Sequence, residues 1–195
     1  MRLGSTMAKG HHVQYNWIED VEALEKYQHG GYHPIMIGDM LNGRYHIADK
    51  LGFGGYSTVW LALDTLLKRY VAVKVNIADS LPRETKALKA LSAPLPSYST
   101  VRPGHDLVPA VLDEFNVQGP NGKHTCYTVK PAQCNLSEIS FSRLFSLKVA
   151  RALSYGLTQA VAYTHSQGYV HGGLSYNYDI YLGFDTISNA DIHKL

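Results

Sequence analysis

Three features of the sequence have residue types that could together bind a phosphate group. Residues 51–59 read Leu-Gly-Phe-Gly-Gly-Tyr-Ser-Thr-Val, and glycines let a backbone close over phosphates with no side chain in the way. Lys74 ends the run Val-Ala-Val-Lys, where a half-buried ammonium is costly unless it meets an anion. Glu84 supplies one anion, and a nucleotide phosphate would supply a second.

Each feature also has an ordinary structural explanation. Glycine-rich turns join many hairpins, an acid in the first turn of a helix is favoured by the helix dipole, and a lysine on an edge strand can extend its ammonium into water. The three features follow one another in the order that a phosphate site requires. That order favours the phosphate site over three unrelated features.

The elements around these residues predict a sheet interrupted by one helix. Five runs rich in β-branched or aromatic residues are separated by glycine or polar breaks: residues 45–51, 57–63, 70–76, 107–117 and 124–129. The last two runs flank Asn121-Gly122, a turn signal because both residues tolerate positive φ. Residues 83–91 (RETKALKAL) have helix-forming composition. We therefore expect five antiparallel strands with one helix after the third.

A long helix is expected from Ser142 to Gln167. Its apolar residues spread over a wide face: Leu144, Leu147, Ala150, Leu153, Leu157, Val161 and Tyr163. The residues that follow contain no second long helical period to cover this face. We therefore expect several of these side chains to stay exposed or to bind a protein partner.

Composition narrows the class of protein. The 195 residues are 45% hydrophobic and 17% charged, with a formal net charge of +2, which is ordinary for a globular domain and gives no basic patch for nucleic acid. Cys126 and Cys134 are too few for a disulfide framework or a closed zinc site. No apolar run is long enough to span a membrane. The expectations are no metal site, no membrane or nucleic-acid partner, and an intracellular location, cytoplasmic or nuclear.

The sequence before and within the glycine segment resembles a known family. Residues 30–34 read Gly-Gly-Tyr-His-Pro, residues 37–39 Ile-Gly-Asp, residues 42–45 Asn-Gly-Arg-Tyr and residues 57–60 Ser-Thr-Val-Trp. Together with the lysine strand, this pattern resembles the SR-protein kinases (SRPK), which are serine/threonine protein kinases. The resemblance extends over about residues 17–182 and is strongest before Lys74.

The resemblance implies an α+β fold of the protein-kinase type. Residues 1–16 would be a flexible leader. Residues 17–132 would form the N-lobe, a five-stranded antiparallel sheet plus the helix called αC, and would end in the hinge. Residues 133–195 would form a partial helical C-lobe with the long helix and the catalytic loop.

The resemblance also implies an ATP site and places residues in it. By position the site residues are Leu51, Gly52, Gly54, Ser57, Val59, Ala72, Lys74, Glu84, Val129, Lys130 and Ala132. In the family pattern Lys74, paired with Glu84, would hold the α- and β-phosphates, and Ala72 would touch adenine. Val129 would lie near the gatekeeper position, and the backbone of residues 130–132 would face the edge of the adenine ring.

The expected catalytic loop departs from the family pattern. After His171 the family has the order His-x-Asp-Leu and then a metal-binding asparagine. This chain has Gly173 in place of the aspartate and Tyr178 in place of the asparagine, with Asn177 one residue out of register. The sequence also contains no Asp-Phe-Gly motif, whose aspartate binds Mg²⁺. We therefore expect no intact catalytic residues, weak ATP binding with little Mg²⁺ dependence, and impaired catalysis.

Two other functions fit parts of the sequence. One is a pseudokinase-type regulatory or scaffold module that binds a protein partner through the exposed face of helix 142–167. The other is a small-molecule kinase of the aminoglycoside-phosphotransferase type, because such enzymes use a His-Gly-Asp loop and His171-Gly172 matches its first two residues. The block at 30–44 and the strand ending in Lys74 favour the protein kinase.

Overall fold

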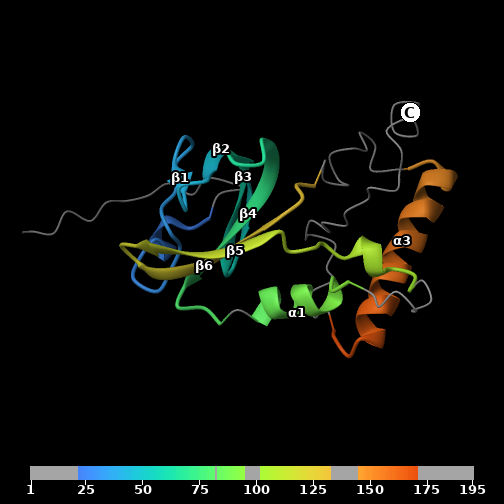
Figure 1. The fold of residues 1–195 in the computed structure, drawn as a ribbon. Coiled ribbons are helices and arrows are strands. Elements are labelled where there is room, and N and C mark those ends of the chain that lie inside the picture. Colours follow the sequence, from blue (N-terminus) through green and yellow to red (C-terminus); the bar gives the residue numbers. More distant parts are fainter. Residues whose placement is uncertain (1–21, 82, 95–101, 133–144, 171–195) are drawn as a thin grey trace, which may run out of the picture.

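A six-stranded antiparallel sheet is the main element of the computed structural model, which describes residues 22–81, 83–94, 102–132 and 145–170 (Figure 1). The sheet order is β1-β2-β3-β4-β6-β5. Its strands are β1 (Met40–Leu41), β2 (Tyr45–Gly54), β3 (Ser57–Asp64), β4 (Arg69–Ala78), β5 (Asp113–Gly119) and β6 (Gly122–Val129). The helices are α1 (Arg83–Leu91) and α3 (Leu147–Ser166), with short 3-10 turns η1 (Leu24–Lys26) and η2 (His105–Leu107).

The expected five-stranded sheet is wrong by one strand. The additional strand, β1, pairs with the start of β2 across a turn in which Asn42 (φ 51°) and Gly43 (φ 61°) both have positive φ. Asn-Gly is a sequence signal for a hairpin turn. Asn42-Gly43 entered the sequence prediction only as part of the family pattern and not as a turn. At the expected Asn121-Gly122 turn a hairpin does form, but its two turn residues are Pro120 and Asn121, and only Gly122 has positive φ.

Two elements begin more than two residues later than the sequence predicts. Strand β5 begins at Asp113 instead of Leu107, because Pro109 has no amide to donate and residues 105–107 form η2. Helix α3 begins at Leu147, where the Ser146 side chain caps it by accepting from the Val149 amide at 3.4 Å. The predicted start at Ser142 lies outside the described residues. Residues 145 and 146, which the prediction placed in the helix, are not helical.

The core lies on one face of the sheet, where alternate side chains are buried. Its members are Tyr45, Ile47, Trp60, Ala62, Val71, Val73, Val75, Phe115 and Cys126. Ile35 and Leu41 belong to the same cluster, so the chain that precedes β2 covers part of this face. Because successive side chains of a strand point to opposite faces, Ala72 and Lys74 point away from the core.

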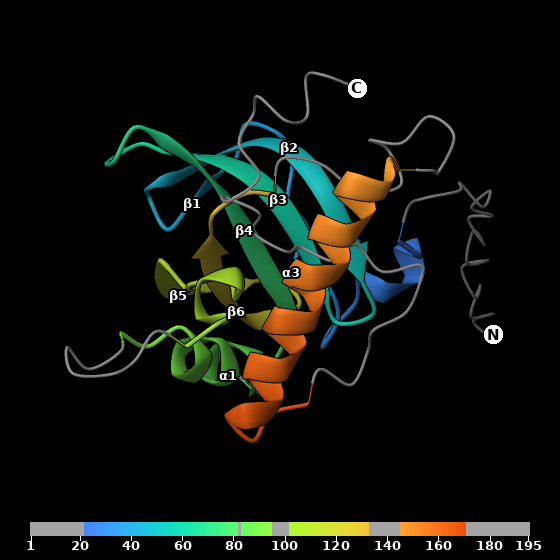
Figure 2. The same cartoon turned by 90° about the vertical axis from the view of Figure 1, so that its right-hand side faces the viewer.

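Helix α3 lies beside the end of α1 and not over the middle of the core. The Tyr163 hydroxyl donates to the carbonyl oxygen of Leu91, the last residue of α1, at 2.7 Å, and the Tyr163 ring meets His105 of η2 edge-on. Figures 1 and 2 show α3 in orange next to α1 in green. The buried residues of α3 are Gly156, Ala160 and Tyr163. The contacts of α3 are thus concentrated in its C-terminal half.

Candidate nucleotide-binding site

Three residues that the sequence assigned to the site lie in one line across the sheet. Gly52 on β2 is opposite Val59 on β3, and Val59 is opposite Lys74 on β4. Directly opposite residues of antiparallel strands have their side chains on the same face. The glycine loop, residues 51–59, consists of the end of β2, the start of β3 and the turn between them. Its last residue, Val59, is therefore the direct neighbour of Lys74 in the sheet. Ser57, where β3 leaves this turn, is buried.

The expected adenine end of the site forms a second line on the same face. Ala72, two residues from Lys74, is opposite Val129 at the end of β6. Lys130 and Ala132 follow β6 directly, which is where a hinge segment would begin. Leu51 lies on β2 beside Gly52. Ala72, Lys74 and Val129 therefore share one face of the sheet, and the ATP-binding roles expected of the site residues stay predictions.

Lys74 forms an ion pair with Glu84. The Lys74 Nζ donates to Glu84 Oε1 at 2.6 Å. Glu84 lies in the first turn of α1, ten positions after Lys74. The Lys74 side chain is 25% exposed and that of Glu84 49%. An ion pair this accessible contributes little to folding stability. The Lys74 ammonium has three N–H donors, so donors remain for a second anion.

Tyr127 forms the floor beside this ion pair, and the sequence had not singled it out. It is opposite Lys74 in the β4·β6 ladder, and Lys74 Nζ lies 5.9 Å from its ring centroid. Burial raises the pKa of the Tyr127 hydroxyl well above its usual value, and the neighbouring Glu84 carboxylate raises it further. The hydroxyl stays protonated and can donate. The alternation of side chains along β6 is the sequence signal that could have placed Tyr127 on this face.

The glycines of the loop fit a group that binds from outside the protein. Neither Gly54 nor Gly55 has positive φ, and a Cβ added to either would meet no atom within 4 Å. Packing and backbone conformation therefore do not require glycine at these two positions. A phosphate group approached closely by the backbone would require it. The loop thus leaves room for the phosphates that a nucleoside triphosphate would bring.

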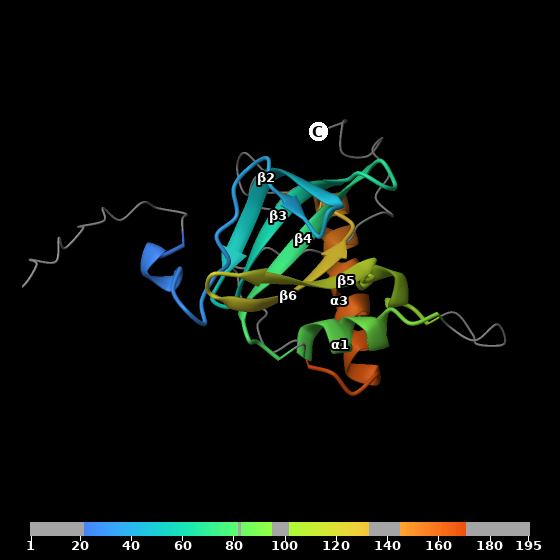
Figure 3. The same ribbon diagram turned by 60° about the vertical axis from the view of Figure 1, so that its left-hand side comes forward.

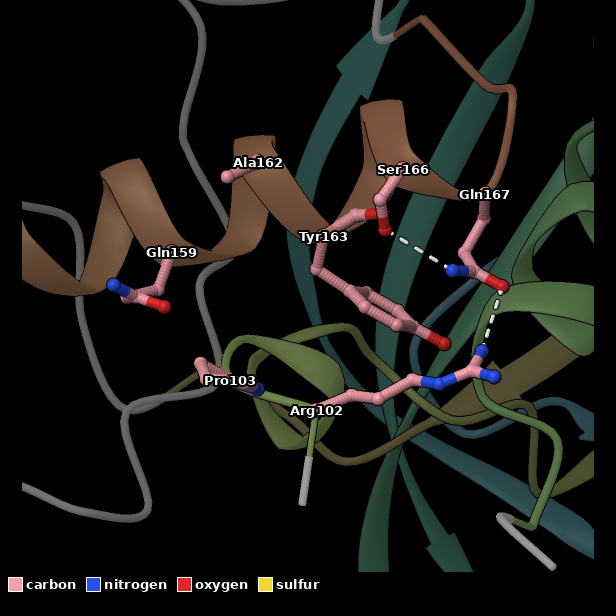
Figure 4. A pocket seen from close by; sticks show the side chains of 7 residues that line it. All are labelled: Arg102, Pro103, Gln159, Ala162, Tyr163, Ser166 and Gln167. Atoms are coloured by element: carbon pink, nitrogen blue, oxygen red, sulfur yellow. Dashed lines mark hydrogen bonds between the residues drawn. The ribbon is translucent and has the colours of Figure 1, made fainter. Parts of the chain in front are cut away.

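Two open hollows lie apart from the residues that the sequence assigned to the ATP site. One, of about 420 Å³, lies between the C-terminal half of α3 and the turn at Arg102. Figure 4 shows Arg102 Nη1 donating to Gln167 Oε1 there, at 3.1 Å. The other, of about 400 Å³, has a polar lining that includes Asp79, Glu114 and Lys123. Neither contains a residue that the sequence assigned to the ATP site.

The catalytic-loop residues His171, Gly173 and Asn177 lie outside the described residues. Within residues 22–81, 83–94, 102–132 and 145–170, no three His, Cys, Asp or Glu side chains lie close enough together to hold a metal ion. In the same ranges no helix is long and apolar enough to cross a membrane.

The arrangement is consistent with a protein-kinase N-lobe: an antiparallel sheet, a glycine loop, and a strand lysine paired with a helix glutamate. Comparison with known proteins agrees, although no protein-family model matches the chain. The serine/threonine-protein kinase spk-1 of Caenorhabditis elegans is 39% identical over 162 residues, 78% of this chain. SRSF protein kinase 3 of Homo sapiens is 39% identical over 117 residues, 57% of this chain.

A serine/threonine protein kinase of Aspergillus fumigatus is 34% identical over 154 residues, 76% of this chain. The chain thus belongs with the SRPK-type serine/threonine protein kinases. It spans only 16% of the length of the nematode protein, 20% of the human protein and 38% of the fungal protein. The activity of those whole proteins therefore comes to this chain only as a proposal.

Proposed function

We propose that this chain is the nucleotide-binding part of an SRPK-like serine/threonine kinase and that it binds ATP between the glycine loop, Lys74 and the hinge. The observation that carries the proposal is the Lys74–Glu84 ion pair at 2.6 Å. Lys74 is the cross-strand neighbour of Val59, and Val59 is the cross-strand neighbour of Gly52 in the glycine loop. In protein kinases the strand lysine of such a pair binds the α- and β-phosphates. The open space around Gly54 supports the same assignment.

We propose further that the chain itself transfers phosphate very slowly or not at all. Phosphoryl transfer depends on metal ions and on an aspartate that accepts the proton of the substrate hydroxyl. Gly173 stands where the family pattern has that aspartate, and no Asp-Phe-Gly motif occurs among the 195 residues. ATP binding would then rest on Lys74, the loop and the hinge, with little contribution from Mg²⁺.

Titration calorimetry with ATP tests the binding proposal. Lys74→Met should weaken binding at least about tenfold, because a hydrogen bond to a charged group contributes about 1.5–3 kcal/mol. Lys89→Met is the matched control, since Lys89 also forms an ion pair, with Glu114, but away from the loop. Adding Mg²⁺ should change the affinity of the unaltered chain little. Strong Mg²⁺-dependent binding that survives Lys74→Met would contradict the proposal.

A phosphate-transfer assay on arginine-serine peptides tests the second part. We expect no transfer by the unaltered chain. Gly173→Asp alone should not restore it, because the aspartate of the Asp-Phe-Gly motif would still be missing. Transfer by the unaltered chain that Lys74→Met abolishes would show the second part to be wrong.

One observation favours a second candidate, a regulatory or scaffold module. Leu147 and Tyr155 on α3 are each 67% exposed, although both are large and apolar or aromatic. A partner protein that covers this face would explain their exposure. The double variant Leu147→Ser, Tyr155→Ser should then lose any co-purifying partner while keeping the ATP affinity of the unaltered chain. An unaltered chain that is monomeric and partner-free at micromolar concentration would count against this candidate.

A further inference from the structure

The segment that precedes β1, residues 22–35, is packed against the sheet at the end where the glycine loop lies. Tyr32 is 1% exposed and Ile35 is 8% exposed, so two of its large side chains are buried. Figure 3 shows the segment, in blue, beside the hairpin turn of β5 and β6.

Hydrogen bonds fix the segment to the turn between β5 and β6 and to the end of β4. The Gly30 amide donates to the Asn121 carbonyl oxygen at 2.9 Å, and Asn121 Nδ2 donates back to the Tyr32 carbonyl oxygen at 2.6 Å. The Ala78 amide, at the end of β4, donates to the Gly31 carbonyl oxygen at 3.0 Å. Three hydrogen bonds to two separate strand ends leave the position of Tyr32 well defined.

From this anchored position Tyr32 reaches the glycine loop. Its hydroxyl donates to the carbonyl oxygen of Gly54 at 2.7 Å. The C=O and N–H of one planar trans peptide unit point in opposite directions. Holding the Gly54 carbonyl toward the segment therefore also sets the direction of the Gly55 amide, one of the loop amides available to a phosphate.

A second contact holds the strand that leads into the loop. Glu22 is 4% exposed, and its carboxylate forms an ion pair with Lys50 on β2 and accepts a hydrogen bond from the Tyr27 hydroxyl. Lys50 Nζ also lies 5.8 Å from the ring centroid of Phe53, in the loop itself. The segment thus contacts the loop region at two points, through Glu22 before it and through Tyr32 at its tip.

We propose that residues 22–35 are a clamp that holds the glycine loop in its phosphate-binding conformation before the nucleotide arrives, with Tyr32 as the positioning residue. Fixing the loop in advance lowers the entropy cost of binding and so raises the affinity. The consequence for affinity rests on the proposed ATP site, whereas the clamp itself can be measured without nucleotide.

Hydrogen exchange on the full 195-residue chain tests the clamp. Tyr32→Phe removes only the hydroxyl, and Tyr45→Phe is a matched control, because Tyr45 is also 1% exposed and its hydroxyl donates to Asp113 at 2.5 Å, away from the loop. Without nucleotide, amides of residues 53–57 should exchange about threefold to tenfold faster in Tyr32→Phe, the factor that one lost hydrogen bond corresponds to. In Tyr45→Phe they should exchange at the unaltered rate.

ATP affinity should fall by a similar factor, about threefold to tenfold, in Tyr32→Phe and not in Tyr45→Phe. Unchanged exchange of the loop in Tyr32→Phe, or equal acceleration in both variants, would overturn the clamp. Faster loop exchange with unchanged ATP affinity would overturn the positioning role of Tyr32. Faster loop exchange in a chain that binds no ATP even when unaltered would keep the clamp and reject the proposed nucleotide site.

Discussion

Two glycine pairs of this chain, Gly30-Gly31 and Gly54-Gly55, are glycine for different reasons. Gly30 has φ +83°, and a Cβ on Gly31 would lie 1.8 Å from the carbonyl oxygen of Lys26. The protein's own fold requires the first pair. Gly54 and Gly55 have ordinary backbone conformations and open space where a Cβ would lie. A glycine that the fold does not require leaves room for a group from outside the protein, as the proposed ATP site needs.

The largest expected effect follows from the first pair. Gly31→Ala should lower the free energy of unfolding by at least about 2 kcal/mol, because backbone must move to admit the methyl group. Gly55→Ala is the control and should change it by less than about 0.5 kcal/mol, as is usual for an exposed position. Urea unfolding measures both. Equal effects of the two substitutions would remove the distinction between the pairs.

A smaller effect is expected on ligand binding from the second pair. Gly54→Ala should leave the free energy of unfolding within about 0.5 kcal/mol of the unaltered value. It should weaken ATP binding by about tenfold, or about 1.4 kcal/mol, because the methyl group takes space that a phosphate needs. Calorimetry measures the affinity. Unchanged affinity in this variant would mean that the open space at Gly54 does not receive the nucleotide.

The smallest effect concerns how the free energy of unfolding depends on pH through His33, two positions after Gly31. Burial and the neighbouring His124 hold the pKa of His33 below its ordinary value of 6.5, while Asp39 opposes them. The unfolded chain therefore binds more protons than the folded chain just below pH 6.5, so stability is full above that pH and declines as the pH falls through the lowered pKa. Urea unfolding at a series of pH values measures the decline, which should be shallower in His33→Asn. Identical pH profiles would refute the assignment.

Much of the site was accessible from the sequence because its determinants are local. Strand alternation placed Ala72 and Lys74 on one face, and the helix composition of residues 83–91 placed Glu84 on α1. The ion pair between Lys74 and Glu84 was expected and is present at 2.6 Å. The predicted ATP-binding roles of these residues remain predictions.

Other features depended on contacts between distant parts of the chain. The sequence contains Tyr32 and Gly54 separated by 22 positions, and no period or motif connects them. The same holds for Lys50 and Glu22, separated by 28 positions. Strand β1 is a local element and was missed for a different reason. Its two residues are too few to show an alternating pattern, and only the turn at Asn42 indicates it.

By itself the sequence determined the run of antiparallel strands with one helix after the third expected strand, and which residue types lie in the glycine loop, because these follow from side-chain periodicity and backbone restrictions of single residues. It also determined membership of the SRPK-type kinases. Only the tertiary structure decided what holds the loop, since hydrogen bonds such as that from Tyr32 to Gly54 exist once the sheet has brought the two residues together. It likewise decided which glycines are required by the fold, because that depends on the atoms that surround each one.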